Sequence, residues 1–273
     1  LTAGSKFEHN DYTGFAIQPG GRILWTPTER QSFWGSVSRA VRTPSRSESD
    51  VVLMQPTGIP GVIAYVQGAE DFDAEKLIAY ELGHRMQLGK KFSLDSAFFY
   101  NVYNDLRSVE TQAPIPGVPL LVPTRAANNL YGETYGFEIS PTWQVTEWWR
   151  LQAGYSLLKM QLHKRPASND STSESDERRN PQNQFSLRSG MDLGNDVQFD
   201  AALRYVDNLP AMSVSSYLEL DLRLGWMPIK NLEFSISGQN LLHAHHSEFN
   251  PSFLQTQRAE VERSVYGKIT WRF

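Results

Sequence analysis

Apolar and polar residues alternate one by one along much of this chain. In residues 214–226 one parity carries leucines at 218, 220, 222 and 224, whereas the other carries Glu219, Asp221 and Arg223. A repeat of two residues places successive side chains on opposite faces of a β-strand. The same division into an apolar and a polar face recurs in residues 149–157 and 197–205. The alternation predicts an all-β protein whose strands have two unlike faces.

Nine further segments have the character of strands, which makes about twelve strands in all. Many of the runs are longer than the five or six residues of an average strand, and reach the roughly 9 to 11 residues that cross a bilayer at a tilt. The strand lengths therefore favour a transmembrane barrel. The nine segments are residues 1–8, 21–26, 31–41, 75–88, 92–103, 130–141, 184–192, 232–240 and 261–273.

The predicted connections alternate between short and long. Outer-membrane barrels are built in this way, with short periplasmic turns and longer extracellular loops. Residues 163–182 are polar and poor in apolar side chains, so they predict a solvated or mobile loop. The expected turns are residues 27–29, 89–90, 145–146, 194–195 and 228–231, and the expected loops are 10–19, 42–73, 104–129, 161–183 and 241–260, with a shorter one at 208–213.

Aromatic residues gather near the turn-side ends of the predicted strands. They are Trp25, Trp143, Trp148, Trp149, Trp226, Trp271 and Phe273. An aromatic girdle at the membrane interface has this placement, whereas a soluble β-sandwich more often spreads such residues through its core. We therefore prefer an antiparallel up-and-down β-barrel in a membrane to a soluble sandwich, which remains the alternative.

Composition and charge exclude several other classes. The 273 residues carry a net charge of -4 without a basic stripe, which argues against a nucleic-acid partner. No run of 18 apolar residues is present, so the sequence excludes a helical membrane protein. The chain has no cysteine, and thus neither a disulfide framework nor a thiolate site. Residues 1–7 already have the pattern of a strand, so we expect the natural N-terminus to lie outside this sequence.

Motifs for covalent chemistry are nearly absent. Residues 156–159 match the pattern SxxK, but on an alternating strand Ser156 and Lys159 point to opposite faces, so we treat the match as chance. The group His243, His245, His246 and Glu248 has donors that bind metals, but lacks the ligand spacing of a closed site. A polar loop is the favoured interpretation there. The sequence assigns no catalytic residue, metal or cofactor.

Charges of both signs recur on the polar parity of the strands, for example at Asp200, Arg204, Asp221 and Arg223. An arginine or lysine facing lipid at mid-bilayer costs about 2 to 4 kcal/mol, so these residues must face the lumen. They are expected to guide a solute, to hold a plug, or simply to form a hydrated wall.

Four segments resemble, in chain order, the outer-membrane receptors that import scarce nutrients with energy from the TonB protein. SRAVRTPSRSE at residues 38–48 is similar to the family's strand-to-loop signature, with Val41 in place of the commoner Phe, and EKLIAYELGHR at 75–85 resembles the strand that follows. ISGQNLLHAHHSEF at 236–249 is similar to the penultimate strand with its Asn-Leu turn. VYGKITWRF at 265–273 resembles the terminal strand. The resemblance extends over the whole chain.

This resemblance implies a 22-stranded barrel with an N-terminal plug domain inside it. Because only about twelve strands are found, we expect residues 1–273 to be the C-terminal part of the barrel, without the plug, the segment that contacts TonB and the first strands. The implied location is the bacterial outer membrane. The implied partners are TonB, outer-membrane lipids and a nutrient chelate. An iron siderophore is the expected ligand, with cobalamin or another chelate as alternatives.

Five residues are candidate ligand contacts on the loop side or lumen side of the barrel. The arginines Arg42, Arg107 and Arg125 are suited to bidentate pairing with the oxygens of an anionic chelate. Tyr103 is suited to stacking on a catechol-like ring, and His245 lies in the last long loop. Two other functions are weighed against the receptor. A passive channel would lack a plug, and a barrel enzyme would need a catalytic group at the rim, where the sequence shows none.

Overall fold

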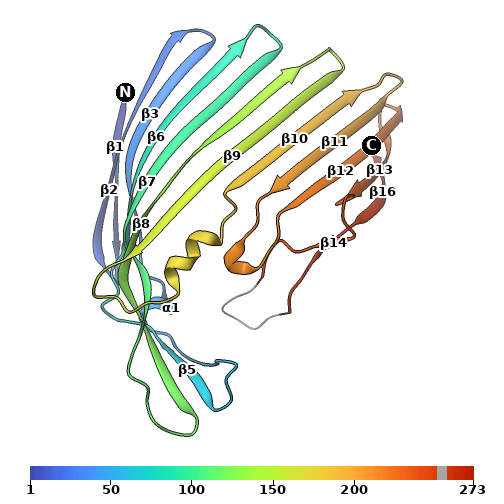
Figure 1. The fold of residues 1–273 in the computed structure, drawn as a ribbon. Coiled ribbons are helices and arrows are strands. Elements are labelled where there is room, and N and C mark those ends of the chain that lie inside the picture. Colours follow the sequence, from blue (N-terminus) through green and yellow to red (C-terminus); the bar gives the residue numbers. More distant parts are fainter. Residues whose placement is uncertain (251–256) are drawn as a thin grey trace.

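The computed structural model describes residues 1–250 and 257–273. Twelve strands form one continuous antiparallel sheet in which each strand pairs with the next along the path (Figure 1). The expected number of about twelve strands is confirmed, as is the antiparallel all-β architecture. The strands are β1 (Thr2–Asn10), β2 (Gly14–Thr28), β3 (Gln31–Arg42), β6 (Glu75–Leu88), β7 (Phe92–Thr111), β8 (Leu120–Gln144), β9 (Trp149–Lys164), β10 (Asn183–Asp192), β11 (Val197–Val206), β12 (Tyr217–Ile229), β13 (Leu232–Gln239) and β16 (Ser264–Trp271).

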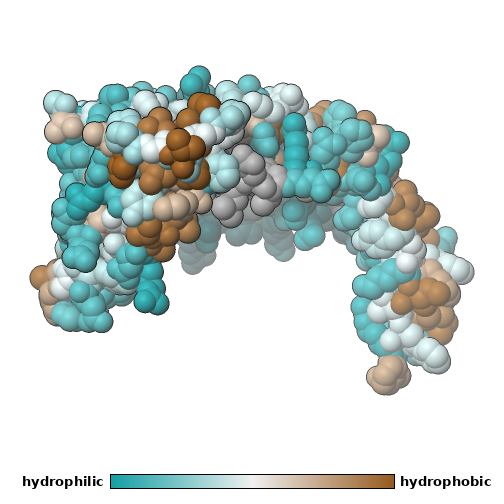
Figure 2. All heavy atoms as spheres, turned by 90° about the horizontal axis from the view of Figure 1, so that it is seen from below, coloured by the Kyte–Doolittle hydropathy of each residue, from teal (hydrophilic) through white to brown (hydrophobic). Residues whose placement is uncertain are grey.

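The sheet curves into an arch with two unlike faces. Seen from the loop end, the right-hand limb is hydrophilic on its concave side and hydrophobic on its convex side (Figure 2). The concave face, here called the lumen face, carries Asp200, Asp221 and Arg223, which line one hollow. On the convex face Leu82 is 65% exposed and Ile269 69% exposed. In water such exposure of apolar side chains would be unfavourable, whereas hydrocarbon would cover them.

Buried apolar side chains are few and lie near the loop end. Leu209, Met212 and Val214 form a small cluster around the 3-10 helix η2 (Pro210–Met212). A soluble β-sandwich would instead bury a face of every strand in one core. The structure therefore agrees with the barrel interpretation of the alternation. None of the helices in the described part of the chain is long and apolar enough to cross a membrane.

Except for the turn between β1 and β2, the short connections lie at one end of the arch, here called the turn end, and the long connections lie at the other, the loop end (Figure 1). At the turn end aromatic side chains stack across neighbouring strands on the convex face: the ring centroids of Trp25 and Phe33 are 5.4 Å apart, and those of Phe33 and His84 are 4.3 Å apart. On the other side of the arch Trp226 stacks on Phe234 at 6.0 Å. The pattern is that of the girdle expected from the sequence.

The prediction of a long loop at residues 10–19 is wrong. β1 runs to Asn10 and β2 begins at Gly14, so only a three-residue turn separates them. The Asn10 Oδ1 accepts the backbone N–H groups of Tyr12 at 3.0 Å and Thr13 at 2.9 Å. Gly14 has a φ of 70°, which a side chain would disfavour. Local side-chain hydrogen bonding therefore replaces the long loop.

The loops expected at residues 42–73 and 104–129 contain regular structure, so these two predictions are also wrong. β7 continues to Thr111 and β8 already starts at Leu120. A helix α1 (Arg46–Ser49) and two strands, β4 (Val52–Pro56) and β5 (Val62–Gln67), occupy the earlier segment. β4 pairs antiparallel with β5, and β5 pairs parallel with the start of β8. Together they form a lobe that projects beyond the loop end of the arch (Figure 1).

The last expected loop, residues 241–260, lies partly outside the described residues, because 251–256 are not described. Its described parts contain β14 (His245–His246), which pairs with β15 (Val261–Glu262).

Candidate functional site

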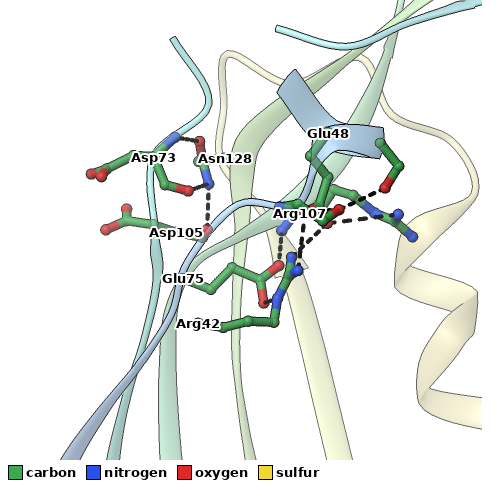
Figure 3. Close-up of polar contacts among 9 residues, drawn as sticks. Arg42, Glu48, Asp73, Glu75, Asp105, Arg107 and Asn128 are labelled. Carbon is green, nitrogen blue, oxygen red and sulfur yellow. Dashed lines mark hydrogen bonds and ion pairs between the residues drawn. The ribbon is translucent and has the colours of Figure 1, made fainter. Parts of the chain in front are cut away.

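A pocket opens on the lumen face at the loop end of the arch. One of its two basic residues is Arg42, the last residue of β3. The Arg42 guanidinium pairs with two carboxylates from different elements (Figure 3). The Nη2 and Nη1 groups donate to the two oxygens of Glu48 on α1 at 2.7 and 3.1 Å, and Nε donates to Glu75 on β6 at 2.7 Å. The pocket is lined by Arg42, Glu48, Glu75, Leu106, Arg107, Leu130, Leu162, Ser173 and Asp176.

Glu48 is fixed in the wall of this pocket, and its side chain is only 5% exposed. It also accepts the backbone N–H of Ser45 at 2.8 Å and the Ser45 hydroxyl at 3.0 Å, which caps the short helix. Burial acts to raise the pKa of Glu48, but the hydrogen bonds from Arg42 and Ser45 outweigh it and hold the pKa at about 2. The carboxylate is therefore charged and already occupied by Arg42.

Arg107 on β7 contacts the same two carboxylates more loosely. Its backbone N–H donates to Glu75 at 2.9 Å, while its guanidinium lies 4.0 Å from Glu48 and its side chain is 53% exposed. Two of the sequence-derived candidates, Arg42 and Arg107, thus meet in one pocket. Arg42 makes three hydrogen bonds to carboxylates, whereas the guanidinium of Arg107 makes only the 4.0 Å contact with Glu48 in the part of the chain that the structure describes.

The other three candidates lie elsewhere. Tyr103 is on β7 opposite Leu77 and Gly132, nearer the middle of the sheet. Arg125 is paired with Asp71 beside the projecting lobe. The Nδ1 of His245 lies 2.6 Å from Glu260. The structure does not bring these three residues together with Arg42 and Arg107.

Sequence reasoning missed a network that braces the pocket. Asn128 on β8 accepts the backbone N–H of Asp73 at 2.8 Å and donates to the carbonyl oxygens of Asp73 at 3.0 Å and Asp105 at 2.7 Å (Figure 3). The Asp105 carboxylate in turn accepts from Lys76 at 2.7 Å and from Arg165 at 3.0 Å. Only the asparagine-rich composition near residue 128 could have suggested such bonds.

The loop predicted at residues 163–182 is largely exposed, as expected for a solvated loop, but it contains a 3-10 helix and folds against this network. Asp170 is 3% exposed and accepts the backbone N–H groups of Val109 on β7 at 2.7 Å, Thr172 at 2.8 Å and Ser173 at 3.0 Å. The helix η1 (Ser173–Arg178) then places Asp176 in the pocket wall. Short polar side chains, which suggested solvation, instead satisfy backbone groups.

Acid should unfold residues 43–51 and 165–182 as the pH falls from about 4.5 to about 2. The pKa of Glu48 is held at about 2 against an ordinary 4.5, and that of Asp170 at about 2 against 3.8, in each case because hydrogen bonds outweigh burial. Since both folded-state values are depressed, their stabilisation is complete above pH 4.5 and is lost as the pH falls towards 2. We expect pepsin to cut residues 43–51 and 165–182 of the barrel in vesicles near pH 2 but not at pH 4.5. Equal cleavage at both values would contradict these roles.

A second cluster lies on the other side of the arch. Glu219 on β12 is 2% exposed, and its Oε1 is 2.6 Å from His243 Nδ1 and 3.2 Å from His246 Nδ1. His246 Nε2 also contacts Glu248, which is paired with Arg204 at 2.7 Å. These contacts fasten the last loop to the lumen face. Within residues 1–250 and 257–273, no group of three histidine or acidic side chains could hold a metal ion.

Comparison with known proteins gives one family and a set of similar structures. Residues 1–241 match the family described as TonB dependent receptor-like, beta-barrel. No curated protein matches the sequence. The siderophore receptor PirA from Acinetobacter baumannii superposes with a TM-score of 0.74 at 14% identity, over 98% of this chain and 42% of that one.

Two further structures are similar in the same way. The ferric enterobactin receptor PfeA from Pseudomonas aeruginosa has a TM-score of 0.74 at 16% identity, over 99% of this chain and 42% of that one. The ferric-catecholate import receptor Fiu from E. coli K12 has a TM-score of 0.68 at 19% identity, over 94% of this chain and 35% of that one. This chain thus spans about two fifths of the length of such receptors.

Proposed function

The chain belongs to the TonB-dependent receptor-like β-barrel family, and from that premise we propose that it is part of a receptor that imports an iron siderophore with energy supplied through TonB. Members of the family are outer-membrane transporters and not enzymes. The siderophore is favoured because PirA, PfeA and Fiu are receptors for siderophores or their ferric complexes. The observation that carries the proposal is the loop-end pocket, in which the half-exposed guanidinium of Arg107 makes only a 4.0 Å contact with Glu48 among the described residues.

We further propose that residues 1–273 are the C-terminal part of the barrel, and that a plug domain and further strands belong to the whole receptor. The open arch supports this, since β1 and β16 each pair on one side only. An unpaired strand edge in hydrocarbon leaves backbone groups unsatisfied, so additional strands would have to close the sheet.

The ligand is tested by intrinsic tryptophan fluorescence of the whole receptor, titrated with iron-loaded catecholate siderophore, iron-loaded hydroxamate siderophore and cobalamin. We expect a saturable change with at least one siderophore and none with cobalamin. Binding of cobalamin alone would contradict the siderophore and leave the family unaffected.

The two arginines of the pocket should respond differently to substitution. Arg107→Ala in the whole receptor should weaken binding of the iron-loaded siderophore by about 10- to 150-fold, since a charged hydrogen bond contributes about 1.5 to 3 kcal/mol, while the melting temperature stays unchanged. Arg42→Ala should lower the melting temperature, because it leaves the Glu48 charge buried without its partner.

Arg85→Ala is the matched control for both measurements, because Arg85 pairs with Asp95 near the turn end of β6, far from the pocket. It should change neither quantity measurably. If Arg107→Ala binds the siderophore as tightly as the unaltered receptor, the pocket is not the binding site.

A further inference from the structure

A buried carboxylate on the lumen face contacts the last loop at the loop end of the arch. Glu219 on β12 is 2% exposed, and its Oε1 lies 2.6 Å from His243 Nδ1 and 3.2 Å from His246 Nδ1. Its second oxygen, Oε2, has no hydrogen-bond partner among the described residues. The side chain of His246 is only 8% exposed. Residues of this chain alone therefore shield the contact between Glu219 and His246 from water.

The charges of this cluster balance only if it holds an extra proton. Arg204 on β11 is opposite Glu219 in the strand register, but its guanidinium pairs with Glu248 at 2.7 Å. In the part of the chain that the structure describes, Glu219 has ion-pair contacts only with the two histidines. With neutral imidazoles, two carboxylates would face one guanidinium. A buried carboxylate without a cationic partner is strongly unfavourable.

His246 is the group whose surroundings require that proton. Its Nδ1 lies at ion-pair distance from Glu219, and its Nε2 lies 3.1 Å from Glu248 Oε1. A neutral imidazole carries a hydrogen on only one nitrogen, so the other would turn a lone pair towards a carboxylate. Only the imidazolium is attracted to both carboxylates. His243 differs, because only its Nδ1 contacts Glu219 and its side chain is 48% exposed.

The loop carboxylate Glu248 reflects the same arrangement. Burial acts to raise the pKa of Glu248, but hydrogen bonds from His246 and Arg204 outweigh it and hold the pKa below its ordinary 4.5. Because the folded-state value is depressed, the stability that Glu248 contributes is complete above pH 4.5. Glu248 therefore stays charged throughout the range in which an imidazole titrates.

The other charged and titratable groups around His246 do not replace the proton. Asp221, the next inward carboxylate of β12, accepts the backbone N–H of Asn240 at 2.9 Å and adds negative charge. Tyr217 packs on His246 with ring centroids 4.5 Å apart, and a tyrosine hydroxyl is neutral below about pH 10. The described charges that follow along the chain are exposed and number two of each sign: Arg258, Glu260, Glu262 and Arg263.

We propose that Glu219 and His246 form a pH-sensitive latch, which holds residues 241–250 against the lumen face while the His246 imidazole is charged and releases them when it is neutral. The latched form binds one proton more than the released form, so its stability falls as the pH rises. A free histidine loses its charge near pH 6.5. The latch is therefore engaged near pH 6 and weakens as the pH rises above about 6.5. It depends neither on the solute nor on TonB.

Hydrogen exchange of the whole receptor in nanodiscs, followed by mass spectrometry, tests the latch. The protection of residues 241–250 is compared at about pH 6 and about pH 8.5, after correction for the intrinsic exchange rate. One linked proton changes the opening equilibrium by up to about tenfold per pH unit, so we expect protection to fall by about tenfold or more. Residues 165–182 are the internal control. Their Asp170, whose pKa is about 2, stays charged at both pH values, so their protection should not change.

Glu219→Gln separates the latch from any other alkaline effect. The amide removes the buried charge and keeps the size of the side chain, so residues 241–250 should stay protected at the higher pH. His246→Gln should lower their protection at the lower pH to the level that the unaltered receptor shows at the higher one. His245→Gln is the matched control, because this neighbouring histidine contacts the exposed Glu260, and it should keep the full pH dependence.

Equal protection of residues 241–250 at both pH values in the unaltered receptor would overturn the latch. A pH dependence that persists in Glu219→Gln, or that disappears in His245→Gln, would also overturn it, because the responsible proton would then lie elsewhere. Since no siderophore is used, these outcomes are separate from failure of the proposed function.

Discussion

Leu222→Arg is expected to abolish most folding of the whole barrel into lipid vesicles. Leu222 lies near the middle of β12, between Leu218 at the loop end and Trp226 at the turn end, and it faces outward. An arginine at the bilayer midplane costs about 2 to 4 kcal/mol. The folded fraction, measured by heat-modifiable mobility on gels, should fall steeply in bilayers of ordinary thickness.

Gln239→Arg is the matched control, because it adds the same charge at an exposed position of the lumen hollow on the neighbouring strand β13. There the charge meets water and the carboxylate of Asp221, so folding should stay close to that of the unaltered protein. If both variants fold equally well, the assignment of the two faces is wrong.

Gly136→Ala should destabilise the barrel by about 3 kcal/mol, the upper range for overpacking a filled site. A Cβ atom at Gly136 on β8 would overlap the carbonyl oxygen of Leu157 on β9 and come within 2.8 Å of the Phe99 ring. The carbonyl belongs to the backbone of a paired strand and cannot turn aside, so β8 and β9 would have to separate. Thermal unfolding in detergent, followed by gel mobility, measures the effect.

Gly21→Ala provides the comparison, since Gly21 lies on β2, which is paired on both sides, and a Cβ there would come no closer than 4.0 Å to another atom. Its effect should stay within about 0.5 kcal/mol. The contrast separates close strand approach from a general intolerance of glycine replacement. A Gly136→Ala protein as heat-resistant as Gly21→Ala would show that β8 and β9 are not packed as described.

Strands with one apolar and one polar face were predictable because membrane and lumen impose opposite demands on alternate residues. β12 is the clearest case, where Leu222 faces outward and Arg223 pairs with two carboxylates in the lumen. The start of β8 gave no such signal. There Thr124 and Arg125 pair with β5 in the projecting lobe. Both faces of a strand outside the membrane tolerate polar residues, so the alternation disappears.

The pocket was predictable only in part. The sequence indicated arginines at the loop end, and Arg42 and Arg107 do meet there. The sequence could not show that Arg42 is tightly paired whereas Arg107 is not. The partners of Arg42, Glu48 and Glu75, come from a helix and a strand that approach each other only when residues 43–51 are folded. The role of Asp170 was missed for a similar reason, since its partner Val109 lies 61 residues away.

Accumulation of iron-55 siderophore in cells measures whether import by the whole receptor depends on TonB. Cells that lack their own receptors would express the whole receptor, either with or without TonB, and be supplied with the siderophore that binds in the fluorescence titration. We expect uptake only where TonB is present, and binding without uptake where it is absent. Equal uptake in both strains would show a passive channel and contradict the receptor.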